Sequence, residues 1–196
     1  STPQLTLFPY TTLFRSYRIH EPPEFSRIQK VRDFVKLLGL PFPEQPTQKD
    51  YQAVIDATKD RIDAPSIHAV LLRSMMQAYY GANNAGHFGL AYEAYTHFTS
   101  PIRRYPDLLL HRAIKAKLKH KPAPLSGAAL DDAGQHFSAT ERRADEASRS
   151  VTTWLKCHYM QQHLGEEFVG TISAVAEFGL FVTLKDLYVD GMIHVS

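Results

Sequence analysis

The most informative stretch of this sequence is residues 87–111, which read HFGLAYEAYTHFTSPIRRYPDLLLH. Its central Thr-Ser-Pro, residues 99–101, predicts the start of a helix, because hydroxyl side chains cap helix N-termini and proline is tolerated in the first turn. Apolar residues then recur at helical spacing as far as Pro122, which ends the segment. We therefore expect a helix over residues 99–121.

Two arginines occupy the first turn of this expected helix. Arg103 and Arg104 lie where the helix dipole and the free backbone N–H groups already favour an anion, and Asp107 offsets only part of their charge. Forked guanidinium groups, amide donors and the dipole would all converge on the oxygens of a phosphate. Because an ordinary solvated helix places acids in this turn, the pair predicts a phosphate-binding site.

Basic residues continue along the same segment. Asp107 is its single acid, against the basic side chains of Arg103, Arg104, Arg112, Lys115, Lys117, Lys119 and Lys121. The formal net charge of the whole chain is only +2, so the rest of the chain is net acidic. Such a concentration of positive charge is typical of a surface that follows phosphates. Taken alone, the lysines between Lys115 and Lys121 are explained by a solvated helix face, whereas the arginine pair is not.

Aromatic rings surround the arginine pair. They are His87, Phe88, Tyr92, Tyr95, His97, Phe98 and Tyr105. Some of these rings could stack on nucleic-acid bases, whereas most of them, taken singly, are better explained as parts of the hydrophobic core.

The remaining sequence predicts a protein of the α+β class. Hydrophobic periodicity indicates helices over residues 26–38, 48–62, 66–80 and 126–164, and strands over residues 17–21, 168–175, 179–184 and 188–195. The last helix is long enough that we expect a break near Gly134. The period changes after Gly165, so we divide the chain into a mainly helical body, residues 17–165, and a β module, residues 166–196.

Composition excludes several classes of protein. The 196 residues are 44% hydrophobic, which is too apolar for a disordered chain. No stretch approaches the roughly 20 apolar residues of a membrane span, and residues 1–16 lack the features of a secretory signal. Cys157 is the only cysteine, so an internal disulfide and a multi-cysteine metal site are excluded. We expect a cytoplasmic protein without a membrane partner.

Several stretches together resemble the RNB family of exoribonucleases. They are His87-Phe88-Gly89-Leu90, Tyr95, Thr99-Ser100-Pro101-Ile102-Arg103-Arg104-Tyr105, Asp107 and His111, with YRIHEPP at residues 17–23, Pro41, ERRADEA at residues 141–147 and Trp154. The resemblance extends over essentially all of residues 17–196. It implies that residues 17–165 are the mainly helical C-terminal part of an RNB catalytic domain.

The resemblance also implies a chemical role for the arginine pair. RNB enzymes degrade RNA processively from its 3′ end and release nucleoside 5′-monophosphates by magnesium-assisted hydrolysis. Arg103 would be the catalytic residue that holds the scissile phosphate, a task that suits a forked guanidinium better than a lysine. The implied RNA-binding residues around it are Thr99, Ser100, Arg104, Tyr105, Arg112 and Glu146. The first four of these would either position Arg103 or contact neighbouring phosphates. Simpler roles remain open for two neighbours, since Asp107 can pair with either arginine and His111 can be a core histidine.

The β module resembles the first part of an S1-type RNA-binding OB fold. The matching stretches are GEEFVGTI at residues 165–172, EFGLFV at residues 177–182 and DGMIHVS at residues 190–196. In such modules Phe178, Phe181 and His194 would lie on the strand face that stacks bases, whereas Phe168 can simply fill the barrel. Because an OB fold has about five strands, we expect an incomplete β-barrel here.

Two features depart from the RNB pattern. The family's metal site is a cluster of closely spaced aspartates, and two-metal hydrolysis needs several converging carboxylates. The acidic pairs Asp131-Asp132 and Glu166-Glu167 are isolated and are expected at the surface. The ligands of Mg²⁺ are therefore expected in a longer parent enzyme, with no metal ligand in this chain. Residues 1–16 have no family counterpart, so we expect a non-native leader and a chain cut at both ends.

These inferences lead to one expected function and two alternatives. The expected function is that of a fragment of a monomeric, cytoplasmic exoribonuclease that acts on the 3′ end of single-stranded RNA. The fragment alone is expected to bind RNA weakly and to lack nuclease activity. One alternative is a non-catalytic RNA-binding protein in which Arg103 only docks phosphate. The other is a helical interaction protein, which leaves the arginine pair unexplained.

Overall fold

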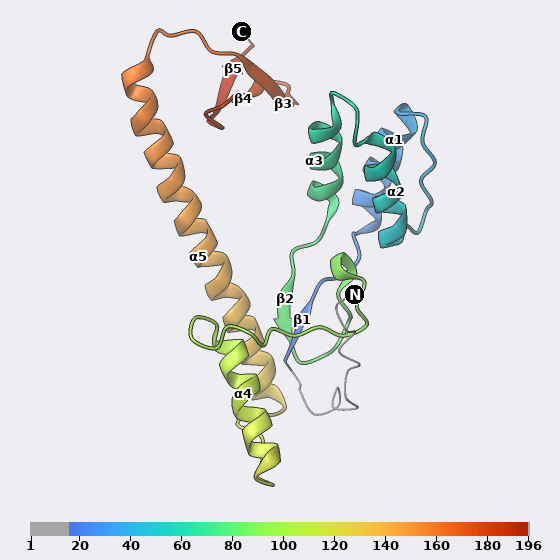
Figure 1. Cartoon of the computed structure of the whole chain (residues 1–196), viewed down its shortest axis with the longest axis vertical. Coiled ribbons are helices and arrows are strands. Elements are labelled where there is room, and N and C mark those ends of the chain that lie inside the picture. The colour runs from blue at the N-terminus through green and yellow to red at the C-terminus, as the bar shows by residue number, and fades with distance from the viewer. Residues whose placement is uncertain (1–15, 196) are drawn as a thin grey trace. The chain divides into compact units, whose positions relative to one another are not determined.

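A computed structural model describes residues 16–195 of the chain (Figure 1). The chain divides into two compact units, one ending at Glu141 and the other beginning at Arg142. Helices and small antiparallel sheets both occur, so the predicted α+β class is confirmed. The expected leader, residues 1–16, lies outside the described residues except for Ser16, whose carbonyl accepts a hydrogen bond of 2.7 Å from the Thr96 hydroxyl.

Within residues 16–141, the first unit contains two short strands, four α-helices and one 3-10 helix, followed by the beginning of a fifth α-helix. In chain order its elements are β1 (Tyr17–Ile19), α1 (Phe25–Leu37), α2 (Gln48–Thr58), α3 (Ala64–Ser74), β2 (Tyr79–Gly81), the 3-10 helix η1 (Phe88–Leu90), α4 (Tyr105–Leu118) and α5 (Ala128–Met160). The helix α5 continues into the second unit.

Helices α1, α2 and α3 share one hydrophobic cluster. Its buried side chains are Val31, Val35, Phe42, Tyr51, Val54, Ile67 and Leu71. A capping box formed by Thr47 and Asp50 begins α2, which satisfies backbone N–H groups at the helix start. Phe88 of η1 packs against this cluster, so the three helices support the beginning of the informative stretch at residues 87–111.

The second and third helices end earlier than predicted. Helix α2 ends at Thr58 and α3 at Ser74, and Tyr79-Tyr80-Gly81 form β2 instead of a last helical turn. Strand β2 pairs antiparallel with β1, with Tyr80 opposite Arg18. The helical prediction for residues 75–80 is therefore wrong. Tyrosine favours strands, but its pairing partner is distant in sequence, so local spacing concealed the strand.

Helix α4 begins later than predicted, which moves the arginine pair out of the helix. Residues 101–103 form a turn, Arg104 occupies the N-cap position, and the helix starts at Tyr105 with Pro106 in its first turn. Had the helix begun at Ser100, the proline would lie in its interior, where it removes a hydrogen bond and clashes with the preceding turn. The prediction that Arg103 and Arg104 occupy the first helical turn is wrong.

A second hydrophobic cluster joins α4 and the start of α5 to β2. It is formed by Tyr80, Leu109, Leu130 and Phe137. Helix α5 is continuous through Gly134, so the expected break is absent. A Cβ atom on Gly134 would lie 2.8 Å from the carbonyl oxygen of Tyr80, so the glycine allows the helix to approach β2 closely. Although α5 is long, no helix within residues 16–195 is long and apolar enough to cross a membrane.

The second unit consists of the later part of α5, the 3-10 helix η2 (Gln161–His163) and a three-stranded sheet. Its strands are β3 (Gly170–Ala176), β4 (Gly179–Leu184) and β5 (Asp190–His194), all antiparallel in the order β3-β4-β5. A register shift between Ile172 and Ala174 marks a bulge in β3. These strands fall within or beside the predicted ranges. The S1-type barrel and the domain boundary at Glu166 stay predictions.

Candidate functional site

The two adjacent arginines of the predicted site have different surroundings. Arg104 Nη2 donates a hydrogen bond of 2.9 Å to Asp107 Oδ2, and this bond raises the pKa of the Arg104 guanidinium. The Asp107 side chain is 0% exposed. The side chain of Arg103 is exposed and has no hydrogen-bond or ion-pair partner within residues 16–195. One arginine is thus engaged by an acid, and the other is free to bind an anion.

The chain before α4 is closed into a turn by backbone groups. The Ser100 amide donates to Asp107 Oδ2 at 2.7 Å, and the Ser100 carbonyl accepts from the amides of Arg103 and Arg104 at 3.2 and 3.0 Å. We call residues 100–104 the arginine turn. The predicted capping by a Thr or Ser side chain is wrong, since the N-cap residue makes no side-chain cap bond and an acid inside the helix binds back to the turn.

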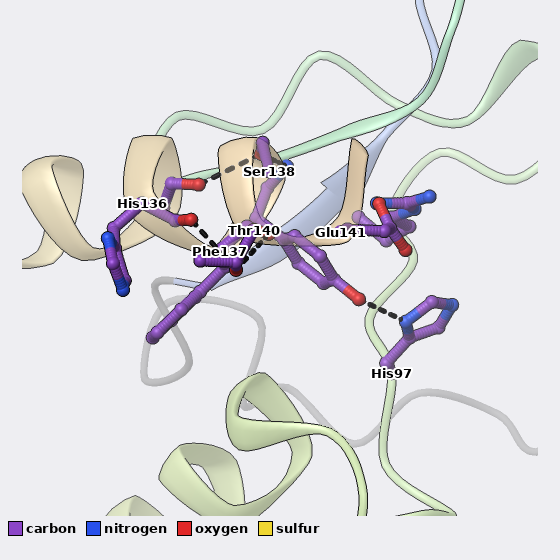
Figure 2. A network of polar contacts seen from close by, with 9 residues as sticks. His97, His136, Phe137, Ser138, Thr140 and Glu141 are labelled. Atoms are coloured by element: carbon purple, nitrogen blue, oxygen red, sulfur yellow. Dashed lines mark hydrogen bonds and ion pairs between the residues drawn. The ribbon is translucent and has the colours of Figure 1, made fainter. Parts of the chain in front are cut away.

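A polar network joins β1, β2 and α5 to the loop that precedes the arginine turn (Figure 2). The Tyr80 hydroxyl lies 2.8 Å from His97 Nδ1, and the guanidinium of Arg18 lies 4.6 Å from the centre of the Tyr80 ring. Arg18 also pairs with Glu141 of α5 at 2.6 Å. On α5, Ser138 accepts a hydrogen bond of 2.8 Å from the Tyr80 amide. These contacts fix the loop relative to the sheet.

Electrostatics keep His97 neutral. Burial lowers the pKa of His97 to about 4, and the positive charges of Arg104 and Arg18 act in the same direction. The neutral ring and the Tyr80 hydroxyl share one hydrogen bond at Nδ1, in which the ring tautomer determines the donor. Burial also raises the pKa of Tyr80, so this hydroxyl stays protonated. His97 thus supplies rigidity, and positive charge at the site comes from arginine.

The glycine-containing segment before the site is fixed by a buried histidine. His20 Nε2 donates to the Met76 carbonyl at 2.6 Å, while its Nδ1 accepts a hydrogen bond of 2.8 Å from the Gly89 amide. A Cβ atom on Gly89 would lie 3.1 Å from that nitrogen, so a larger residue would crowd the contact. Burial, followed by the nearby His20 ring, lowers the pKa of His87. His20 therefore holds η1 against the end of β1.

Several rings near the arginine turn are accessible. Tyr92, Phe98 and Tyr105 are 56%, 46% and 49% exposed, so they belong to the minority of rings that can meet a ligand. Phe98 stacks on His111 at 4.4 Å between ring centres, and His111 Nε2 lies 2.9 Å from the Phe98 carbonyl oxygen. His111 is therefore a satisfied, partly buried histidine, close to the simpler role expected of it.

Two more predicted RNA-binding residues lie beside the arginine turn. Arg112 Nη1 donates to the Tyr105 hydroxyl at 3.0 Å, and its guanidinium lies 5.6 Å from the centre of that ring. The Thr99 side chain is exposed. The structure thus gathers Thr99, Ser100, Arg103, Arg104, Tyr105 and Arg112 around one helix start.

The other predicted RNA-binding residues belong to the second unit. The rings of Phe178 and Phe181 meet edge to face, with 6.1 Å between their centres. His194 lies opposite Gly179 in the β4–β5 pairing, and Gly179 directly follows Phe178 in the sequence. Glu146 is exposed on α5, and Phe168 is 38% exposed. The two phenylalanines and the histidine therefore gather at one end of the β4–β5 pair.

Acidic residues within the described part of the chain do not form a metal site. No group of three or more His, Cys, Asp or Glu side chains among residues 16–195 is arranged to hold an ion. The pairs Asp131-Asp132 and Glu166-Glu167 are exposed, which confirms them as surface acids. The carboxylates described here therefore do not fit the magnesium site that the family resemblance implies.

Three structurally important residues received no individual role from the sequence. Tyr80 is only the last residue of the helix expected over residues 66–80, while His20 and Glu141 fall within the strings at residues 17–23 and 141–147 that carry the family resemblance. That resemblance was the only signal for the two latter residues, because their contacts join segments 69 and 123 residues apart.

Solved structures share this fold. The chain is similar to ribonuclease R of Mycoplasma genitalium in complex with ribose-methylated single-stranded RNA, with a TM-score of 0.83 and 27% identity over 93% of this chain and 30% of that chain. The same enzyme in complex with double-stranded RNA gives a TM-score of 0.81 and 27% identity over 94% and 34% of the two chains. Yeast Ssd1, described as a pseudonuclease, is 23% identical over 94% and 24% of the two chains with a TM-score of 0.74, and shares the fold alone.

Curated relatives give the same result at higher identity. Ribonuclease R of Vibrio cholerae serotype O1 is 48% identical over 194 residues, and that of Escherichia coli K12 is 46% identical over 193 residues. Both matches cover 92% of this chain and 24% of the relative, so the chain spans about a quarter of the length of the curated relatives it matches. The RNB domain model matches residues 13–120, more than half of the chain. The chain therefore belongs to the RNB family.

Proposed function

We propose that this chain is part of a 3′-to-5′ exoribonuclease that hydrolyses RNA to nucleoside 5′-monophosphates. The observation that carries the proposal is the exposed guanidinium of Arg103, which has no partner within residues 16–195 and lies beside an arginine that a buried acid engages. The similar ribonuclease R structures with single-stranded and double-stranded RNA support RNA as the ligand.

Arg103 would bind the scissile phosphate. A guanidinium can donate two parallel hydrogen bonds to the non-bridging oxygens of a phosphate and can stabilise negative charge that develops during hydrolysis. Arg104 has one nitrogen committed to Asp107, so its role would be to shape the turn more than to contact RNA. Tyr105, Arg112 and Thr99 lie beside the turn and would contact neighbouring nucleotides.

The second unit would contact RNA through its exposed rings. Phe178 is 51% exposed and meets Phe181 edge to face, an arrangement that leaves ring surface for a base. His194 and the exposed carboxylate of Glu146 would complete these contacts. We propose that this unit includes the beginning of an S1-type module.

Magnesium would act through residues other than the carboxylates described here. We place the parent enzyme in the cytoplasm, as a monomer. The chemistry that Mg²⁺ would supply there is activation of water and stabilisation of negative charge on the leaving oxygen. Because no set of three or more candidate ligands converges within residues 16–195, the chain by itself should bind the 3′ end of single-stranded RNA without cleaving it.

The proposal is tested by incubating the purified chain with uniformly labelled single-stranded RNA and Mg²⁺. We expect binding that Arg103→Ala weakens, no release of nucleoside monophosphates, and unchanged binding for Arg73→Ala, an exposed arginine in the last turn of α3. Steady release of monophosphates that Arg103→Ala abolishes would overturn the predicted inactivity of the chain.

A non-catalytic RNA-binding protein is the second candidate. The lack of a converging carboxylate cluster within residues 16–195 favours it. Sequencing the coding region upstream discriminates the two candidates, because an in-frame aspartate cluster supports the enzyme and its absence supports binding alone. A helical interaction protein would instead show no salt-dependent affinity for RNA.

A further inference from the structure

One buried carboxylate contacts both ends of the arginine turn. Asp107 Oδ2 accepts from the Ser100 amide at 2.7 Å and from Arg104 Nη2 at 2.9 Å, and the side chain is 0% exposed. A buried charge is tolerated only when it is paired and hydrogen-bonded, so the carboxylate strongly favours a conformation in which both donors stay in place.

Arg103 lies inside the segment that these bonds close. Its amide donates to the Ser100 carbonyl at 3.2 Å, so its backbone is fixed while its guanidinium has no partner within the described residues. A charged group on a fixed backbone loses less freedom when it binds an anion, which is the general advantage of preorganisation. The turn therefore preorganises the backbone of Arg103 for binding an anion. Asp107 is buried and would not contact that anion itself.

We propose that Asp107 is a positioning residue, which fixes the arginine turn and keeps Arg104 engaged so that Arg103 is the arginine of the pair presented to phosphate. The inference rests on the proposed function, in which Arg103 binds a phosphate of RNA. It goes further, because it states that a single buried acid determines which of two adjacent arginines binds the phosphate.

Simple electrostatics predict a different result when Asp107 is neutralised. Loss of a negative charge near a phosphate site would strengthen binding of RNA and would leave the contribution of Arg103 unchanged. Under the proposal, Asp107→Asn keeps an acceptor for the Ser100 amide but loses the ion pair that holds Arg104. The turn then becomes less rigid, so the contribution of Arg103 to RNA binding decreases. This decrease is expected whether the total affinity for RNA rises or falls.

A double-mutant cycle measures this difference. The dissociation constant of the chain for a 5′-labelled oligouridine is determined at low salt for the unsubstituted chain, Arg103→Ala, Asp107→Asn and the double variant. We expect Arg103→Ala to weaken binding about tenfold in the unsubstituted chain and by less than about threefold in the Asp107→Asn background. Asp131→Asn, an exposed acid in the first turn of α5, should leave the tenfold effect intact.

The outcomes separate the inference from the proposed function. An equal loss in both backgrounds overturns the positioning role of Asp107 and leaves phosphate binding by Arg103 in place. No loss on Arg103→Ala in the unsubstituted chain overturns the proposed function, and the inference with it. Circular dichroism checks folding. If Asp107→Asn does not fold, Arg104→Ala, which removes the same ion pair, takes its place in the cycle with the same expected factors.

Discussion

The guanidinium of Arg104 donates to a fully buried carboxylate, whereas that of Arg103, one residue earlier, is exposed. Because Asp107 binds only Arg104, the two adjacent arginines differ in their availability to an anion. The same principle applies to His97, which stays uncharged because it is half-buried near two arginines. Environment, more than residue type, determines which groups at this site can meet a phosphate.

His97 should make the stability of the chain depend on pH. Its pKa of about 4 in the folded chain lies below the ordinary histidine value of 6.5, so between these values the unfolded chain binds a proton that the folded chain does not. This stability is fully present above the unfolded pKa and is lost as the pH falls through 6.5 towards 4. His97→Asn keeps an acceptor for the Tyr80 hydroxyl but cannot titrate, so it should flatten this dependence.

Urea unfolding at several pH values across that window measures the effect. His120→Asn serves as the control, since His120 is exposed at the end of α4 in a left-handed conformation that asparagine tolerates. A pH dependence that is identical in the unsubstituted chain and in His97→Asn would contradict the neutral state assigned to His97.

At the residue scale, the sequence predicted the types of the important side chains but not their pairing. Asp107 lies three residues after Arg104 and four after Arg103, and both spacings bring side chains together on a helix. Only the actual start of α4, which leaves both arginines outside the helix, determines that Asp107 binds Arg104.

At the element scale, α5 depends on a glycine to pack against β2. Gly134→Ala should gain about 1 kcal/mol of helix propensity, but the added Cβ would lie 2.8 Å from the Tyr80 carbonyl oxygen. We expect the overpacking to dominate, with a net loss of about 1–3 kcal/mol in the free energy of unfolding. Gln135→Ala, on the exposed neighbour, should be neutral or stabilising. A stabilised Gly134→Ala variant would show that the helix does not approach β2 this closely.

The same helix should also depend on one buried hydroxyl. Ser138 Oγ accepts from the Tyr80 amide and donates to the Gly134 carbonyl, both at 2.8 Å. Ser138→Ala leaves the amide without this partner and should lower the free energy of unfolding by about 1–3 kcal/mol in chemical denaturation. Ser150→Ala, exposed on α5, is the matched control. Equal stabilities of the two variants would refute the bridging role of Ser138.

Elements were predictable where local signals agreed. Residues 179–184 begin with a glycine, continue with the strand-favouring Phe181 and Val182, and form β4 as expected. The Thr-Ser-Pro signal favours an early start of α4, and this prediction is wrong. Pro106 disfavours that start, because a proline in the helix interior removes a hydrogen bond, and α4 begins at Tyr105. Strand β2 could not be predicted locally, since its partner β1 is distant in the sequence, with Tyr17 opposite Gly81.

At the scale of the whole molecule, the formal net charge of +2 hides a strongly basic α4 segment within an otherwise acidic chain. The sequence alone revealed this distribution and the α+β class. It could not reveal the contacts of His20 with Gly89 or of Arg18 with Glu141, because such long-range pairs leave no periodic pattern. Those contacts join the segment around β1 to η1 and to α5.

The most direct test of the account is the salt dependence of single-stranded RNA affinity for the unsubstituted chain and Arg103→Ala. Each phosphate contact contributes about 0.7 to the slope of log affinity against log salt concentration. We predict that Arg103→Ala lowers the affinity about tenfold at low salt and reduces the slope by about 0.7, whereas Arg73→Ala changes neither. Equal affinities and slopes for the unsubstituted chain and Arg103→Ala would contradict the account.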